Sequence, residues 1–589
     1  MHQQCRQCCS KTCTASNVRK KLPILTWLPK YSVGALQGDI IAGLTVALTV
    51  IPQGLAYASV AQLPPQYGLY SAFMGCFVYC VLGTAKDITL GPTAIMSLMT
   101  ATFATSPVTG DATLAVVLTL MCGIVQFVMA ILHVGFLVDF ISVPVMSSFV
   151  TSAAITIAFG QVPKWLGLKD IPRAFFPKVY WTCKKLPETN VWDLLLGLVS
   201  LVILFTLRRL QNVKWRQTDD LTLGQKISRK ILWVVGTSRN AIVVVTASGV
   251  AAILISQDVD VFSQTTHVQP GLPSFSLPKF SLHSGNVTLS THQLFQELGF
   301  GLAVVPLIGL IETIAIGKAF ARKNNYEIDA NQELLAIGAA NIVGSFIGSY
   351  PVTGSFSRTA VNSESGVRTP AGGLFTGAVI ILALAVLTPL FPYIPTAALA
   401  AVIIAAVINM VHFRMVIYLW KRKKVDLVPW TVTFVFSFVL GIEYGILLGV
   451  GISLFLLLYP WARPKVKIKH QEVAVIQLSN GLLFPGVQYV TERVNRQALA
   501  DGIAKSAVVD FSHVTDVDSS ALQGLKQLSE DFAKRDTMLV LSNVDPEVLD
   551  VLNKANFSHI KYCKTNEDAI QLIYGKLPPV HTCLVHSTK

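Results

Sequence analysis

Long stretches of this chain carry almost no charge. Examples are residues Leu194–Leu207, Ala241–Ile255, Gly377–Leu390 and Val432–Tyr459. A helix needs about 20 mainly apolar residues to cross the hydrocarbon layer of a membrane. With 589 residues, 52% of them hydrophobic and only 14% charged, the chain is too apolar for an ordinary soluble protein of several domains. The sequence therefore predicts an α-helical protein that crosses a membrane many times.

Two Gly/Pro-rich breaks interrupt the apolar pattern, at Gly91–Met99 and at Pro351–Thr359, and each leads into a short helical segment. A broken helix is tolerated in lipid only where its free backbone groups meet protein or a watery cavity. Paired breaks in two halves of a membrane chain are the best sequence indication of a transporter's substrate site. Helix starts favour anions, and Arg358 adds a positive charge, so the pattern predicts an anion carrier.

The net charge of +14 is distributed as expected for a membrane protein. Its clusters at residues 208–230, 318–323 and 421–424 lie between apolar spans, as cytoplasmic loops do, which argues against a nucleic-acid partner. Asn286 begins a glycosylation sequon, which implies an outer loop. Both assignments agree if both termini are cytosolic. The same span count places Lys164–Lys185 outside, although that loop holds six basic residues; either it attracts anions or the count is wrong there.

The first 30 residues are polar and basic and do not have the pattern of a cleavable signal peptide. We interpret residues 1–30 as a cytosolic segment. Its cysteines have no zinc-site spacing, and they are either palmitoylated or part of a disordered tail; they are Cys5, Cys8, Cys9 and Cys13.

The strings Pro-Gln-Gly-Leu-Ala-Tyr-Ala at 52–58 and Leu-Pro-Pro-Gln-Tyr-Gly-Leu-Tyr at 63–70 are highly specific. With the two breaks, they resemble the sulfate permease (SulP) family of anion transporters, from about residue 30 to about residue 575. The resemblance implies fourteen membrane segments in two inverted repeats of seven, sorted into a core and a gate domain within residues 31–460. It also implies a homodimer. Periodicity alone predicts twelve to fourteen spans without their pairing.

Beyond the membrane region, strands predicted at Val473–Leu478, Ser506–Phe511 and Thr537–Leu541 alternate with helices predicted at Gln488–Ile503, Ser519–Phe532 and Pro546–Leu552. This order predicts a small cytosolic α/β domain, and it resembles a STAS domain, at residues 465–577, followed by a tail at 578–589. Related modules carry a phosphorylated serine at the position of Ser519 or Ser520. The alternative is an ordinary helix cap by Asp518 or Ser519.

By the resemblance, the anion pocket contains residues from the first helix and from both breaks: Gln53, Tyr57, Thr93, Ala94, Ser355, Phe356, Ser357 and Arg358. Their chemistry fits this role, because hydroxyl and amide groups donate hydrogen bonds to anion oxygens, and aromatic rings form an apolar wall. The alternative is that Ser355 only caps a helix and Arg358 reaches to the membrane interface.

Two helix starts contribute roughly +0.5 each, and Arg358 contributes one full charge, so the site offers about +2. Glu312 lies in a largely apolar span and, if it is ionised, reduces this to about +1. We hypothesise that Glu312 tunes the charge of the bound anion and couples sulfate uptake to protons. The alternative is a carboxylate held by a backbone group or a basic partner.

The sequence thus predicts a sodium-independent secondary transporter of sulfate, with chloride, oxalate and bicarbonate as further substrates, working by an elevator-like motion in the plasma membrane or in a lysosomal or other internal membrane. We expect lipid as its surroundings, and neither a cofactor, a metal nor an enzymatic activity. A chloride-selective channel-like protein and an anion-dependent membrane motor remain alternatives. A sensor that signals through the C-terminal domain is a third.

Overall fold

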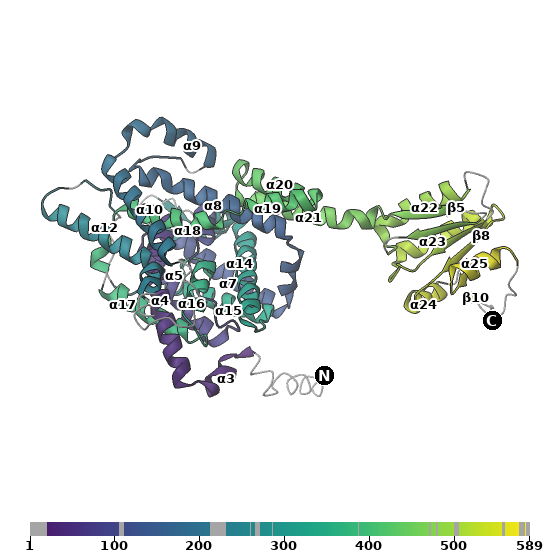
Figure 1. Ribbon diagram of the computed structural model, residues 1–589, viewed down its shortest axis with the longest axis horizontal. Helices are drawn as coiled ribbons and strands as arrows, with labels where there is room; N and C mark the ends of the chain where they lie inside the picture. The colour runs from purple at the N-terminus through teal and green to yellow at the C-terminus, as the bar shows by residue number, and fades with distance from the viewer. Residues whose placement is uncertain are drawn as a thin grey trace, which may run out of the picture. The chain divides into compact units, whose positions relative to one another are not determined.

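The computed structural model describes residues 21–104, 111–172, 174–211, 231–259, 261–264, 271–284, 287–386, 388–470, 473–478, 481–499, 506–555, 560–575 and 583–584. The chain divides into two compact units, residues 1–450 and 451–589. Figure 1 shows that the first is a helical bundle and that the second is built around a sheet.

Fourteen helices in the described residues are candidates for the fourteen membrane segments that the resemblance implies. In the first half they are α4 (Val33–Val60), α5 (Gln66–Leu82), α6 (Ala94–Phe103), α7 (Thr113–Ile131), α8 (Val143–Trp165), α10 (Val191–Gln211) and α12 (Arg239–Ser256). In the second half they are α14 (Gly301–Asn324), α15 (Ala330–Ser345), α16 (Phe356–Glu364), α17 (Gly372–Val386), α18 (Thr396–Val407), α20 (Leu427–Val439) and α21 (Ile442–Ala462).

The remaining helical elements connect these segments. They are α3 (Ile24–Trp27), η1 (Leu28–Lys30), η2 (Val134–Phe140), α9 (Phe175–Lys184), η3 (Leu186–Glu188), α13 (Thr291–Leu298), η4 (Thr388–Tyr393), η5 (Ile408–Met410), α19 (Arg414–Arg422) and η6 (Lys424–Asp426). Strands β2 (Leu282–Ser284) and β3 (Val287–Leu289) form a short antiparallel pair before α13.

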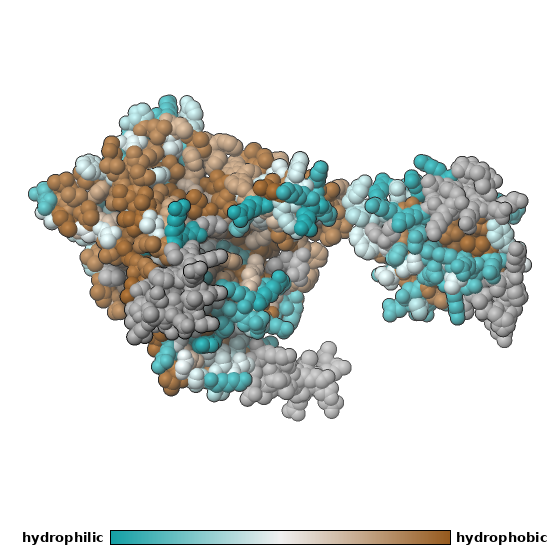
Figure 2. Space-filling view, viewed as in Figure 1, coloured by the Kyte–Doolittle hydropathy of each residue, from teal (hydrophilic) through white to brown (hydrophobic). Residues whose placement is uncertain are grey.

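The membrane segments pack in two groups. Helices α4, α5, α7, α14, α15 and α17 contact one another, and we call them the core bundle; α8, α10, α12, α18 and α20 form the gate bundle. Seven helices of the described chain are long and apolar enough to cross a membrane by themselves. Many exposed side chains are large and apolar, and Figure 2 shows hydrophobic residues over much of the visible face of this unit. Such a surface suits contact with lipid rather than water.

Each predicted break consists of a short strand followed by a short helix. Strand β1 (Leu90–Gly91) precedes α6, and β4 (Thr353–Gly354) precedes α16. The strands pair antiparallel, with Leu90 opposite Gly354 and Gly91 opposite Thr353. Because the strands pair, the starts of the two short helices meet, although about 260 residues separate them in the sequence.

The C-terminal unit contains a six-stranded sheet with the order β10-β9-β8-β7-β6-β5. The central strands β6 (Ala474–Leu478), β7 (Ser506–Asp510), β8 (Met538–Ser542) and β9 (Ile560–Cys563) are parallel, whereas β5 (Val466–His470) and β10 (Cys583–Leu584) join the edges antiparallel. The helices are α22 (Phe484–Leu499), α23 (Ser519–Ala533), α24 (Pro546–Lys554) and α25 (Asn566–Ile573).

Alternating strand residues fill two cores in this unit. Ile476, Val509 and Leu541 face α22, α23 and α24 on one side of the sheet. Val508 and Val540 face α25 on the other side. Side chains along a strand point alternately to the two faces, so this pattern buries both faces of the sheet. The α/β interpretation of the segment is confirmed, and the three predicted strands lie within one residue of their expected bounds.

Three groups of sequence predictions fall outside the described residues. They are the glycosylation sequon at Asn286, the cysteines Cys5, Cys8, Cys9 and Cys13, and most of the tail at 578–589. They stay predictions.

Candidate functional site

The two half-helix starts form the floor of the candidate site. The backbone N–H of Ser355 donates to the carbonyl of Thr89 (3.2 Å), which joins the second break to the first just before their helices begin. Thr93 is the N-cap of α6, and its hydroxyl accepts from the backbone N–H of Met96 (3.2 Å). Ser355 occupies the N-cap position of α16 without a side-chain capping bond. Its hydroxyl instead lies 3.4 Å from that of Ser357.

Arg358 is the most unusual residue of the site. Its side chain has an exposed fraction of 0%, and its three guanidinium nitrogens have no hydrogen-bond partner. A buried charge without a partner is costly, so the arrangement favours a ligand of opposite charge. The alternative in which Arg358 reaches to the membrane interface is wrong, because the side chain is fully enclosed.

Gly91 provides the space for this guanidinium. A Cβ added at Gly91 would lie 3.0 Å from Nη1 of Arg358, and the backbone there has φ +154°. Both the close contact and the backbone conformation disfavour any residue with a side chain. The glycine of the first break therefore accommodates the arginine of the second.

Helix α4 contacts both α6 and α16 and brings Gln53 and Tyr57 to the same region. Both side chains are buried, with exposed fractions of 3% and 5%, and Oε1 of Gln53 has no hydrogen-bond partner. Ala94, at the first position of α6, is also buried. Together with Thr93, these residues place two polar groups and one aromatic ring beside the helix starts.

Phe356 and Ser357 differ from the other predicted residues because both are exposed. The ring of Phe356 has an exposed fraction of 60% and meets the ring of Phe320, with centroids 5.4 Å apart. Of the two expected aromatic walls, Tyr57 is therefore enclosed and Phe356 is largely open in this structure. An open position at the first turn of α16 is a suitable place for an entrance.

Glu312, on α14, does reach the site. Its Oε2 accepts a hydrogen bond from the hydroxyl of Thr93 (3.3 Å), and the carboxyl group interacts electrostatically with Arg358. The same hydroxyl caps α6, so Thr93 links the carboxyl group to the first helix start. Since no guanidinium nitrogen of Arg358 is hydrogen-bonded, the two groups do not form a direct ion pair.

Sequence reasoning did not identify the polar residues that hold β4 in place. Asn341 accepts from the backbone N–H of Val352 (2.9 Å) and donates to its carbonyl (3.2 Å). The hydroxyl of Thr313 lies 2.7 Å from that of Thr353 and accepts from the backbone N–H of Gly354 (2.9 Å). These side chains satisfy a strand of only two residues inside an apolar bundle. Asn341 and Thr313 could have been noticed in the sequence as polar residues within apolar helices, but the sequence does not show which backbone groups they bind.

The site thus combines two sets of free backbone N–H groups, a buried guanidinium and several hydroxyls, which together suit a small anion. The comparisons agree with this chemistry. Residues 36–433 match the model of the sulfate permease family, and residues 465–569 match that of the STAS domain. The chain belongs to the sulfate permease family.

The sequences of several relatives align with nearly the whole chain. The chain is 46% identical over 562 residues to the sodium-independent sulfate anion transporter of Bos taurus, covering 95% of this chain and 92% of that protein. It is 30% identical to sulfate transporter 4.1, chloroplastic, of Arabidopsis thaliana, covering 89% of this chain and 78% of that one. The solved structure of murine solute carrier 26 family member A9, an anion transporter in the inward-facing state, matches with a TM-score of 0.83 at 22% identity over 95% of each chain. This sulfate permease family member is therefore a multi-pass membrane protein with that fold and a C-terminal STAS domain.

In the STAS domain, Asp518 is the N-cap of α23. Its carboxylate accepts from the backbone N–H groups of Ala521 (2.8 Å) and Phe484 (2.7 Å). Ser519 and Ser520 are exposed in the first turn. Capping by Asp518 is confirmed, and phosphorylation of either serine stays a prediction.

Proposed function

We propose that this protein is a sodium-independent secondary transporter of sulfate and of other small anions, with the anion held between the starts of α6 and α16. The observation that supports this most is the enclosed guanidinium of Arg358, which has no partner beside the two helix starts. The helix starts and Arg358 together offer about +2, which balances sulfate. The naming of the bovine relative as a sulfate anion transporter points to the same substrate.

The two-bundle arrangement supports an elevator-like motion. Both half-helices and Glu312 belong with the core bundle, since α14 contacts α6 and α16 and α4 contacts both of them as well. A core that moves as one body past the gate bundle would carry the whole site across the membrane without taking it apart.

The proposal is tested by a counter-anion panel in proteoliposomes. Labelled sulfate uptake is measured without sodium, with chloride, oxalate, bicarbonate or gluconate inside. We compare the native protein with Arg358→Gln and with the matched control Arg368→Gln, because Arg368 is exposed. Hydrogen bonds to a charged group contribute about 2 kcal/mol, so Arg358→Gln should raise the KM for sulfate about 30-fold or abolish uptake, and the control should resemble the native protein.

If the native protein moves chloride but not sulfate, or if Arg358→Gln transports normally, the assignment fails. Reversal potentials under chloride and sulfate gradients separate a transporter from a chloride-selective channel. Charge movement without tracer flux would indicate the membrane motor.

We further propose that Glu312 couples sulfate uptake to protons. The hydrogen bond from Thr93 places its carboxyl group at the first helix start, where a negative charge opposes a divalent anion. Protonation would remove that opposition, so sulfate uptake by the native protein should rise as the outer solution is acidified. Glu312→Gln, which mimics the neutral acid, should make uptake high and independent of pH. A mutant that keeps the native pH profile would exclude coupling through this residue.

The assembly and the location of the protein are also part of the proposal. We expect a homodimer with both termini in the cytosol, in the plasma membrane or in an internal membrane such as the lysosomal one. Cross-linking in native membranes and surface biotinylation test these expectations.

A further inference from the structure

A cavity of about 730 Å³ lies at the C-terminal ends of the membrane segments α4, α6, α8 and α20. Its wall includes Ser59 and Gln62 at the end of α4, Thr102 at the end of α6, Lys164 at the end of α8 and Ser437–Ile442 at the junction of α20 and α21. All these positions lie on the outer side in the proposed topology. The basic loop that follows α8 therefore lies at the same face as the end of α4, as the span count predicts.

The wall of this cavity contains two ammonium groups, those of Lys164 and Lys178, and no carboxylate among the described residues that line it. The two groups are close enough to repel each other, and neither forms a salt bridge within the described part of the chain. Partial burial lowers the pKa of Lys178, because the charged form is less well hydrated there. An anion between the two groups would compensate both charges.

The local contacts direct these side chains into the wall. Nζ of Lys178 lies near Gly160 of α8, where an added Cβ would be 3.6 Å from it. Gln161, one residue further along α8, also lines the cavity. Lys184, on the same helix α9 as Lys178, instead lies over the ring of Trp181, 4.8 Å from its centroid.

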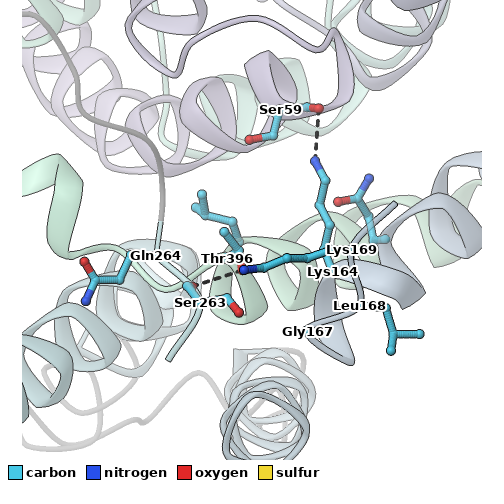
Figure 3. Close-up of a pocket in the computed structure, with 10 residues that line it drawn as sticks. Ser59, Lys164, Gly167, Leu168, Lys169, Ser263, Gln264 and Thr396 are labelled. Atoms are coloured by element: carbon cyan, nitrogen blue, oxygen red, sulfur yellow. Dashed lines mark hydrogen bonds between the residues drawn. The ribbon is translucent and has the colours of Figure 1, made fainter. Parts of the chain in front are cut away.

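Lys164 also connects the two bundles. Figure 3 shows its side chain extending from α8 to Ser59, and its Nζ donates to the carbonyl of Ser59 (3.1 Å). That carbonyl belongs to the last turn of α4, where a positive charge is favourable. Lys164 borders a second cavity of about 230 Å³ as well, which Lys169 also lines. A purely structural helix cap accounts for the contact with Ser59 but not for the uncompensated Lys178.

We propose that this cavity is an outer anion-binding site, distinct from the site at Arg358, in which Lys164 and Lys178 hold a small oxyanion such as sulfate before it is transported. The distance along α6 from Ala94 to Thr102 is about 12 Å at 1.5 Å per residue, so the two sites lie at opposite ends of one short helix. An anion bound here would compete with the Ser59 carbonyl for the ammonium group of Lys164. Because this hydrogen bond joins α8 to α4, anion binding would loosen the contact between the core bundle and the gate bundle.

The test measures the electrostatic potential of the cavity and does not require transport. Thr102→Cys is introduced with Cys183→Ser, because Cys183 is an exposed free cysteine whereas Cys76, Cys80 and Cys122 are buried. Intact cells are treated from outside with an anionic or a cationic methanethiosulfonate reagent, and the two reaction rates are compared. Ala174→Cys, which also lines the cavity, is a second reporter in case the first variant fails to fold.

We expect the anionic reagent to react faster than the cationic one. The double variant Lys164→Gln with Lys178→Gln should lower the ratio of the anionic to the cationic rate at least about tenfold. The reason is that focused fields change local concentrations of charged reagents by factors of 10 or more. Lys184→Gln is the matched control and should leave the ratio within about twofold. Sulfate at constant ionic strength should slow the anionic reagent more than gluconate does, and only when both lysines are present.

An unchanged ratio in the double variant would overturn the proposal, and so would equal protection by sulfate and gluconate or a reporter that external reagents never reach. The inference rests on the proposed anion transport, but the two can fail separately. Arg358→Gln should abolish sulfate uptake and leave labelling of the outer cavity unchanged.

Discussion

Replacing Gly91 by alanine should weaken anion binding and should also strain the backbone. The added Cβ would lie 3.0 Å from Nη1, 3.2 Å from Nη2 and 3.3 Å from Cζ of Arg358. Favourable contacts between such atoms are about 3.5 Å or longer, so the guanidinium must withdraw by roughly 0.5 Å. The contact involves the far end of a flexible side chain, so the shift is possible. It moves the charge away from the two helix starts.

The backbone adds a second cost. Gly91 has φ +154°, a value that residues with a Cβ rarely adopt, and the strain should cost about 1–2 kcal/mol. The misplaced charge should reduce anion binding by about 1.4 kcal/mol or more, which is a factor of about ten in affinity. We therefore expect Gly91→Ala to raise the KM for sulfate about tenfold while the protein still reaches the membrane.

The assay is sulfate uptake in proteoliposomes at matched protein density, together with thermal unfolding in detergent. Gly249→Ala is the matched control, because nothing lies within 4 Å of the Cβ that it would add. A Gly91→Ala variant whose KM equals that of the native protein and of the control would refute the reasoning. Loss of folded protein alone would show that strain outweighs the displacement of Arg358.

Three further predictions concern the supports of the site and the STAS domain. Asn341→Ala leaves the buried N–H and carbonyl of Val352 without a partner; at about 1–3 kcal/mol for each such group, it should lower the unfolding temperature and reduce sulfate flux. Asp518→Ala should destabilise the STAS domain by about 1 kcal/mol, measured by urea unfolding of residues 465–577, and Glu530→Ala, which removes an exposed carboxylate from the same helix, is its control. Burial raises the pKa of Asp510, but hydrogen bonds from Asn566 and Asn543 outweigh burial and lower this pKa in the folded domain. The ionised carboxylate of Asp510 therefore stabilises the fold fully above the pKa of the unfolded chain, near 4. This stabilisation is lost as the pH falls through the lower pKa of the folded domain. Unfolding temperatures between pH 5 and pH 2 should fall more steeply for the native domain than for Asp510→Asn.

The sequence predicted those parts of the fold that depend on local patterns. Strand β7 begins at Ser506 as expected, because β-branched residues follow one another directly and buried parallel strands need no polar alternation. Strands β5, β9 and β10 were not predicted. They are short, and their pairing depends on strands elsewhere in the chain. Helix α22 begins at Phe484 rather than at the predicted Gln488. Pro485 lies in its first turn, a position where proline is tolerated.

For the site, the sequence predicted the location better than the electrostatics. Gly/Pro breaks are visible in one sequence, but the contact between Thr93 and Glu312 joins residues 219 positions apart. The sequence alone left two alternatives for Glu312, a carboxyl group that couples transport to protons or one held by a backbone group or a basic partner. The structure gives a third arrangement, in which a hydroxyl at the first helix start donates to it.

Under the proposed function, this difference decides whether a proton can change the selectivity of the site. If Glu312 formed an ion pair with Arg358, the two charges would cancel and only the helix starts would remain, with about +1 in total. Such a site would favour chloride over sulfate. In the structure the guanidinium nitrogens have no partner and Glu312 binds Thr93 instead, so no direct ion pair with Arg358 holds Glu312 in its ionised form. The charge that the anion experiences is then set by the protonation of one carboxyl group, about +2 when it is neutral and about +1 when it is ionised. If the proposed coupling holds, a single proton would change the preferred anion from monovalent to divalent without any change in the fold. The pH profile of Glu312→Gln therefore separates proton coupling from a purely structural role.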